Sequence, residues 1–134
     1  MQVCDHIGIF TRNLKPMKKF YMDVLGFSLD SESKLSGEIM GKIFGYAHDC
    51  HFIKLYKDGF LIELFSPISK DSQTPRNCMT GLNHWGYCVA DRRSFIEGLC
   101  RKDQATVEID RNGRKVYFVI DPDGNPIEIR DYQR

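Results

Sequence analysis

The chain has 134 residues, of which 42% are hydrophobic, and its 19 basic and 18 acidic residues give a formal net charge of +1. This length is enough for one hydrophobic core and too short for two large independent domains. The charges are mixed along the sequence, which indicates neither a face for nucleic acid nor one for an anionic membrane. No segment of the sequence has the pattern of a signal peptide or a membrane span. We therefore expect a cytoplasmic protein that acts on small molecules.

The cysteines do not form a recognisable disulfide or metal pattern. They are odd in number, widely spaced and without a Cys-x-x-Cys pair: Cys4, Cys50, Cys78, Cys88 and Cys100. We expect reduced and mostly buried thiols, and a nucleophilic cysteine would need a basic partner in space.

The chain begins with a strand and a helix. Residues 3–10 alternate in the manner of a strand and place His6 near its middle. Asn13 is suited to cap a helix, Pro16 is tolerated in a first turn, and apolar residues recur at helical spacing until Gly26 ends the pattern.

The rest of the first half is predicted to be mostly strand. The Asp58-Gly59 dipeptide favours a tight turn, and the alternating run behind it predicts a strand with Glu63 in its interior. The segments before that turn are predicted as a strand at 27–30, a polar loop at 31–37 and strands at 39–46 and 50–56.

The second half repeats this order after a linker. Residues 66–80 contain two prolines and many polar residues, which predicts a linker between a first module at 1–65 and a second at 81–134, within one compact domain. The second module is predicted to contain a strand at 82–89, a helix capped by Asp91, strands at 106–109 and 116–120, and a strand that carries Glu128 after the turn at 121–124.

The repeat extends to individual residues. His6-Ile7-Gly8 corresponds to His84-Trp85-Gly86, and the run that contains Glu63 corresponds to the run that contains Glu128. Each half is predicted to begin with a strand and a helix and to end in a run of strands, three in the second half, which indicates a duplicated unit and a pseudo-symmetric pair of sheets.

Two histidines and two glutamates therefore occupy equivalent positions. If the first and last strands of a half are neighbours, its His and Glu converge, and two such pairs suit zinc, nickel, cobalt, iron or manganese with positions left open for water or substrate. The alternative for each residue is structural: a satisfied core or surface histidine and a solvent-facing glutamate.

The sequence resembles the vicinal oxygen chelate superfamily, which includes glyoxalase I, methylmalonyl-CoA epimerase, extradiol dioxygenases and bleomycin-binding proteins. The resemblance covers nearly the whole chain and is most specific in Phe20-Tyr21, in Leu25-Gly26-Phe27 and in the run at 121–129. It implies the α+β glyoxalase/bleomycin resistance/dioxygenase fold, in which two βαβββ modules form a curved, cleft-containing mixed sheet. It also implies one divalent metal ion (Ni, Co, Zn, Mn or Fe) held by the residues His6, Glu63, His84 and Glu128.

A filled set of four such residues resembles glyoxalase I and the epimerases more than other members. We therefore expect a metal-dependent isomerase or lyase that abstracts a proton next to the carbonyl of a small-molecule carbonyl or thioester substrate, with the enediolate stabilised by the metal. Glu128 is the expected base and Glu63 a second carboxylate across the metal. The resemblance further implies a homodimer.

The sequence leaves two other hypotheses about the function open. One is a metal-dependent dioxygenase or thiol transferase, and the other is a metal-free small-molecule (drug) binding protein of the same fold. Arg130 shares a strand face with Glu128 and is suited either to an anionic substrate group or to an ion pair at the rim.

The other candidate residues are predicted to have structural roles. His48 and His51 are predicted at the surface, Arg92 and Arg93 on a solvated helix face, and Cys4 and Cys88 as small apolar filling near the histidines.

Overall fold

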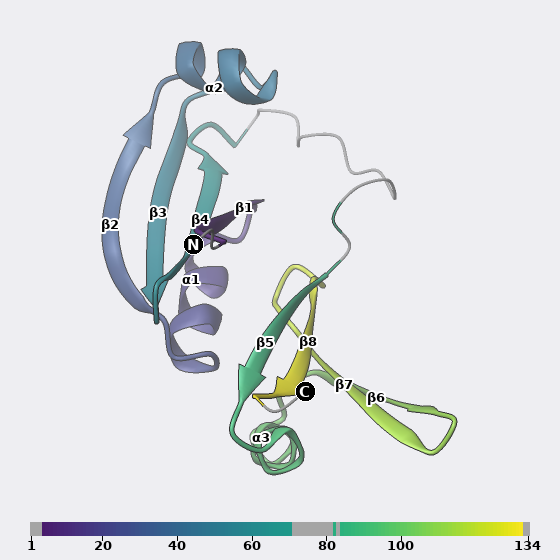
Figure 1. Cartoon of the computed structure of the whole chain (residues 1–134). Helices are drawn as coiled ribbons and strands as arrows, with labels where there is room; N and C mark the ends of the chain where they lie inside the picture. Colours follow the sequence, from purple (N-terminus) through teal and green to yellow (C-terminus); the bar gives the residue numbers. More distant parts are fainter. Residues whose placement is uncertain (1–3, 71–81, 83, 133–134) are drawn as a thin grey trace. The chain divides into compact units, whose positions relative to one another are not determined.

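The computed structural model describes residues 4–70, 82 and 84–132. The chain divides into two compact units, Met1–Asn77 and Cys78–Arg134, which are described separately (Figure 1). The predicted linker at 66–80 lies outside the described residues from position 71 onward, and its first two residues belong to a strand that ends at Pro67. Within the described part of the chain, no helix is long and apolar enough to cross a membrane.

The first unit is a four-stranded mixed sheet with two helices (Figure 1). Its strand order is β1-β4-β3-β2, in which β1 and β4 are parallel and the other pairs are antiparallel. The elements in chain order are β1 (His6–Phe10), α1 (Leu14–Asp23), β2 (Ser28–Leu35), α2 (Gly37–Phe44), β3 (Cys50–Lys57) and β4 (Phe60–Pro67).

The second unit has the same sheet topology with one helix. Its strand order is β5-β8-β7-β6, with β5 parallel to β8 and the other pairs antiparallel. The elements are β5 (Trp85–Val89), α3 (Arg92–Cys100), β6 (Thr106–Arg111), β7 (Arg114–Ile120) and β8 (Pro126–Asp131). The predicted α+β fold of two βαβββ modules is confirmed, and α2 is an addition to the first.

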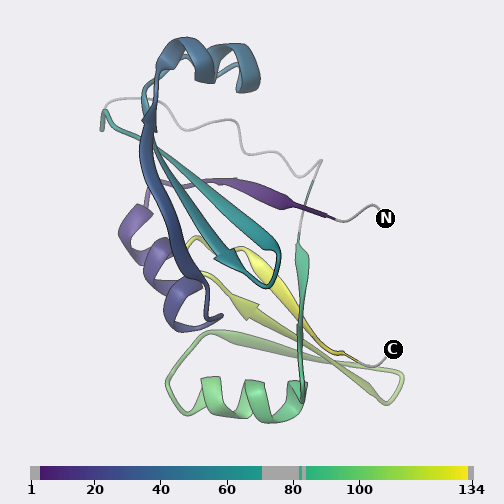
Figure 2. The same cartoon turned by 60° about the vertical axis from the view of Figure 1, so that its left-hand side comes forward.

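The prediction of a strand at 39–46 is wrong, because residues 39–44 belong to helix α2. The Ser36 hydroxyl accepts a hydrogen bond from the Ile39 amide at 3.3 Å, and Gly45 ends the helix with a φ of 67°. Its apolar residues recur at helical spacing, and Met40 is fully buried on that helix. In Figures 1 and 2, α2 lies at the end of the sheet between β2 and β3.

The predicted polar loop at 31–37 is also wrong over most of its length. Strand β2 continues through it to Leu35 and pairs antiparallel with β3. Nearly all side chains of β2 are exposed, so its sequence lacks the alternation of a half-buried strand even though its backbone is paired. A register shift between Leu29 and Ser31 marks an irregularity in this edge strand.

The turns and one of the two predicted caps agree with the sequence. Asp58 and Gly59 have φ values of 49° and 84°, which fit the tight turn between β3 and β4. The Asp91 carboxylate accepts a hydrogen bond from the Ser94 amide at 2.8 Å at the start of α3. Asn13 stands at the N-cap of α1, but its side chain makes no capping hydrogen bond.

The buried face of each sheet fixes the direction of the glutamates. Ile62 and Leu64 on β4 are completely buried, and α1 packs against this strand. Ile127 and Ile129 on β8 are buried in the same way beside α3. Because side chains alternate along a strand, the glutamate between each pair points to the opposite face, away from the helix.

Candidate functional site

In the first unit, His6 and Glu63 lie together on the open face of the sheet. His6 begins β1, and the parallel register pairs Gly8 with Glu63. His6 Nε2 is 3.7 Å from Glu63 Oε2. Gly8 has no side chain between the two, and a Cβ there would meet Phe65 at 3.3 Å.

The second unit repeats this arrangement with His84 and Glu128. His84 immediately precedes β5, and Gly86 pairs with Glu128 in the same parallel register. His84 Nε2 is 3.7 Å from Glu128 Oε2. The His84 ring also packs edge-on against Phe118, with ring centroids 5.7 Å apart. Within each unit the structure thus brings the predicted His and Glu together, and the two pairs are equivalent.

The two members of each pair differ in exposure. The imidazoles are open to solvent, with 47% of the His6 side chain and 43% of the His84 side chain exposed, whereas Glu63 and Glu128 are 15% and 21% exposed. Carboxylates covered to this extent need compensating partners. Each pair therefore presents an accessible nitrogen beside a largely covered oxygen donor.

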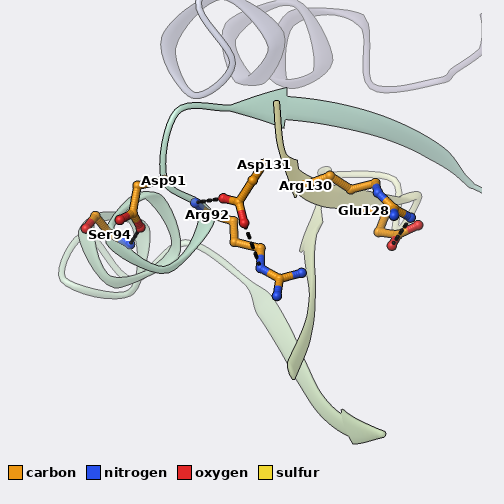
Figure 3. A network of polar contacts seen from close by, with 6 residues as sticks. All are labelled: Asp91, Arg92, Ser94, Glu128, Arg130 and Asp131. Atoms are coloured by element: carbon orange, nitrogen blue, oxygen red, sulfur yellow. Dashed lines mark hydrogen bonds and ion pairs between the residues drawn. The ribbon is translucent and has the colours of Figure 1, made fainter. Parts of the chain in front are cut away.

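A cation lies beside the second oxygen of each glutamate. Glu63 Oε1 is 3.8 Å from Lys54 Nζ, which comes from the neighbouring strand β3. Glu128 Oε1 accepts a hydrogen bond of 3.1 Å from Arg130 Nη1, two residues further along β8 (Figure 3). In both carboxylates, therefore, one oxygen lies near the histidine and the other lies near a cationic side chain.

Asp5 acts on the other ring nitrogen of His6. The Asp5 carboxylate is 2.8 Å from His6 Nδ1. This hydrogen bond is the main cause that raises the pKa of His6, followed by the charge of Glu63. A proton held on Nδ1 leaves the lone pair of neutral His6 on Nε2, on the side of Glu63, as in histidines that bind metals.

The donor set of each pair fits a divalent cation. Imidazole nitrogen and carboxylate oxygen bind such ions at about 2.1 Å, so two bonds span up to about 4.2 Å and a gap of this size accommodates an ion. One pair supplies only two ligands, and within the described residues no group of three or more His, Cys, Asp or Glu side chains lies together. A complete centre therefore needs further ligands besides those of a single pair.

A pocket of about 390 Å³ adjoins the second pair. Its lining residues come from the residue before β5, the start of α3, the β6–β7 turn, β7 and β8: His84, Arg92, Asn112, Arg114, Val116, Phe118, Glu128 and Arg130. From the sequence, Arg92 is predicted on a solvated helix face, and Asn112 and Arg114 are predicted only as part of a hairpin turn at 111–114. Residues 114, 116 and 118 alternate on β7, and this signal would have placed them on one face with Phe118 opposite Glu128.

The other candidate residues lie apart from these contacts. His48 is exposed and packs against Tyr46 with centroids 4.7 Å apart, and His51 is half-buried on β3. The prediction of mostly buried thiols is wrong for the described cysteines, because only Cys50 is buried, whereas Cys4 and Cys100 are exposed and Cys88 is half-buried. All of these are free thiols, and Cys78 lies outside the described residues.

The chain is similar in sequence or in fold to several known proteins. The chain is 32% identical over 131 residues to the uncharacterized protein YaeR of Escherichia coli (strain K12), with 92% of each chain covered. It is similar in fold to a glyoxalase family protein from Enterococcus faecalis, with 24% identity, a TM-score of 0.70 and 96% of each chain covered. The trypanothione-dependent glyoxalase I of Leishmania major has 19% identity and a TM-score of 0.70, with 98% of this chain and 87% of that chain covered.

A family model matches almost the entire sequence, from residue 3 to residue 129. This match includes both His–Glu pairs and the turn at 121–124. The chain therefore belongs to the Glyoxalase/Bleomycin resistance protein/Dioxygenase superfamily.

Proposed function

We propose that this protein is a metal-dependent isomerase or lyase of glyoxalase I or epimerase type. Its substrate is a small molecule with a carbonyl or thioester, from which it abstracts a proton at the adjacent carbon. The observation that carries the proposal is the equivalence of the two pairs, in which the same two atoms of His and Glu lie 3.7 Å apart at the same register position of each module.

Chance does not readily account for this equivalence. A single histidine beside a glutamate on a sheet is often an ordinary surface ion pair. Here the module was duplicated, and both copies retain His, Gly two residues later, and Glu opposite that Gly. The cations differ between the copies, Lys54 in one and Arg130 in the other, so the pairs share their donor atoms but not all of their surroundings.

The four side chains of His6, Glu63, His84 and Glu128 would together hold one divalent cation. Two imidazoles and two carboxylates suit Ni, Co, Zn, Mn or Fe and leave positions open for substrate oxygens. When bound, such a cation supplies Lewis-acid stabilisation of the negative charge that develops on the substrate oxygen.

The chain's own residues move the proton. Glu128 accepts the proton from the substrate carbon as general base, while Arg130 holds its Oε1 atom and so limits rotation of the carboxylate. Glu63 occupies the equivalent place in the first module. It serves as the second base: in epimerisation Glu63 starts as the carboxylic acid and gives its proton to the opposite side of the carbon, Glu128 keeps the proton it took, and exchange with water restores both residues.

Family membership and the likeness in fold to a glyoxalase I support this reaction class. The test is proton exchange in deuterated water: protein loaded with Ni, Co, Zn, Mn or Fe in turn is incubated with a thiohemiacetal or an acyl thioester, and deuterium at the carbon is followed by NMR. We expect metal-dependent exchange. Absence of exchange with every metal and both substrates would contradict the proposal, and oxygen uptake by the iron-loaded protein would indicate a dioxygenase instead.

A further inference from the structure

The pocket beside His84 and Glu128 carries an excess of positive charge. Three arginines line it, Arg92, Arg114 and Arg130, against the single carboxylate of Glu128. Arg130 is bonded to that carboxylate, and Arg92 lies 3.4 Å from Asp131. Arg114 has no ion-pair partner among the residues that the structure describes. Such a pocket attracts an anion.

The strand registers place the arginines in one direction from Glu128. Arg130 follows Glu128 along β8, and β7 runs antiparallel with Phe118 opposite Glu128, so Arg114 extends toward the same end. Strand β5 is parallel to β8, and Arg92 follows its end. The pocket therefore leads from the His84–Glu128 pair toward the end of β8, where the positive charge gathers.

At the far end of the pocket, contacts with neighbouring residues hold Arg92 in place. Asp131 accepts hydrogen bonds from the Arg92 amide at 2.8 Å and lies beside the Arg92 Nε atom (Figure 3). The Arg92 guanidinium also lies 5.7 Å from the centroid of the Tyr117 ring. These contacts restrict Arg92, whereas Arg114 keeps its donors for an occupant of the pocket.

On the β7 side, the stretch between the two ends is apolar. Val116 and Phe118 line the pocket on β7 between Arg114 and the histidine. Arg114 and Phe118 are four positions apart along the strand, which corresponds to about 13 Å between their Cα atoms. An occupant that uses the whole pocket has a reactive end at the pair, an apolar middle and an anionic end.

We propose that this pocket binds the anionic oxygen group, a carboxylate or a phosphate, at the far end of the substrate, and that Arg114 is its principal ligand. As a statement about the substrate this rests on the proposed function. Guanidinium groups bind both anions through paired charge-assisted hydrogen bonds. The proton-transfer substrate is thus an acid or a phosphorylated compound whose charged group lies on the order of 10 Å from the reacting carbon.

The first test is binding to the metal-free protein, because a bound metal would itself attract anions. Protein stripped with EDTA is titrated separately with inorganic phosphate and with succinate, and backbone amide shifts are followed by NMR. We expect saturable shifts at β7 and β8, and the anion that binds more tightly identifies the group. In Arg114→Gln the affinity should fall about tenfold or more, as for the loss of a charge-assisted hydrogen bond.

The matched control is Arg101→Gln, which removes the same charge from an exposed position at the end of α3, outside the pocket lining. It should bind both anions as the wild type does. The inference is overturned if neither anion gives saturable shifts, or if Arg114→Gln and Arg101→Gln bind equally well.

The second test separates this inference from the proposed reaction. In the exchange assay, Arg114→Gln should raise KM for a carboxylated thioester at least tenfold with little change in kcat, and should leave KM for its methyl ester unchanged. Anion binding without exchange on any substrate would refute the reaction and keep the subsite. Exchange with the same KM in wild type and Arg114→Gln would refute the subsite and keep the reaction.

Discussion

Oε2 of Glu128 lies 3.7 Å from Nε2 of His84, and the same two atoms of Glu63 and His6 are 3.7 Å apart in the other module. Both contacts follow from a parallel pairing of the first and last strands of the module, with a glycine opposite each glutamate. Equivalent donors in two copies of one unit are the basis of the function proposed above.

Replacing the proposed base should stop the reaction without unfolding the protein. In Glu128→Gln an amide oxygen can still accept the hydrogen bond from Arg130, so the sheet should remain intact, whereas the proton acceptor is lost. We expect deuterium exchange to fall about 10²–10⁴-fold. Exchange rates and a thermal unfolding curve measure the two effects.

Glu97→Gln is the control, since this glutamate pairs with Arg93 on the exposed side of α3. It should exchange at the wild-type rate. If Glu63→Gln abolishes exchange while Glu128→Gln does not, the roles of the two carboxylates are reversed.

Asp5 should control the protonation of His6 in the metal-free protein. Its hydrogen bond is the first cause of the raised pKa of His6, so Asp5→Asn should lower that pKa toward the ordinary value. Because the pKa of His6 is raised in the folded protein, the Asp5–His6 hydrogen bond stabilises the fold fully below the ordinary pKa of 6.5. This contribution to stability is lost as the pH rises through the pKa of His6 in the folded protein.

An NMR titration of the His6 ring protons measures this shift, and an unchanged pKa in Asp5→Asn would contradict the assignment. Metal binding needs the neutral imidazole, so metal affinity should weaken as the pH falls through the pKa of His6.

The buried face of β8 should contribute to stability rather than to chemistry. Ile127 is fully buried on the helix side, and Ile127→Ala should lower the free energy of unfolding by about 2–5 kcal/mol. Ile43 is 64% exposed on α2, so Ile43→Ala should change it by less than about 0.5 kcal/mol. Urea unfolding compares the two, and similar losses would mean that the faces have been misassigned.

Cys50 should react slowly with thiol reagents. It has no exposed surface, and burial raises the pKa of its thiol, with the charge of Asp49 as the second cause. Cys4 is exposed and should be alkylated first at pH 8. Timed alkylation followed by peptide mass spectrometry gives the order, and equal rates at the two cysteines would contradict it.

The features that the sequence predicts well are those with a local and repeated signal. The Asp-Gly turns, the alternation around Glu63 and Glu128, and the apolar stripes of α1 and α3 all have short-range causes, and the repeat ties the two halves together. The neighbouring placement of each His and Glu then follows from the βαβββ topology.

The sequence does not predict features that depend on tertiary contacts. Strand β2 has no buried face, so its pairing with β3 leaves no periodic signal. Helix α2 is short, and the burial of Met40 in a cluster that includes Phe65 of β4 stabilises it through a part of the chain distant in sequence. Arg114 and Arg92 share a pocket only because the ends of β5, β7 and β8 meet, which no local spacing reveals.

The proposed function requires both histidines to bind one metal ion, so the decisive measurement is the metal content of the purified protein. Protein purified without chelator should contain about one divalent ion per chain, as four ligands from two equivalent pairs predict. His6→Ala and His84→Ala should each lose most of this metal, whereas His48→Ala, which removes an exposed histidine from the turn before β3, should retain it. If the metal content stays unchanged in both His6→Ala and His84→Ala, these histidines are not metal ligands and the proposed site is wrong.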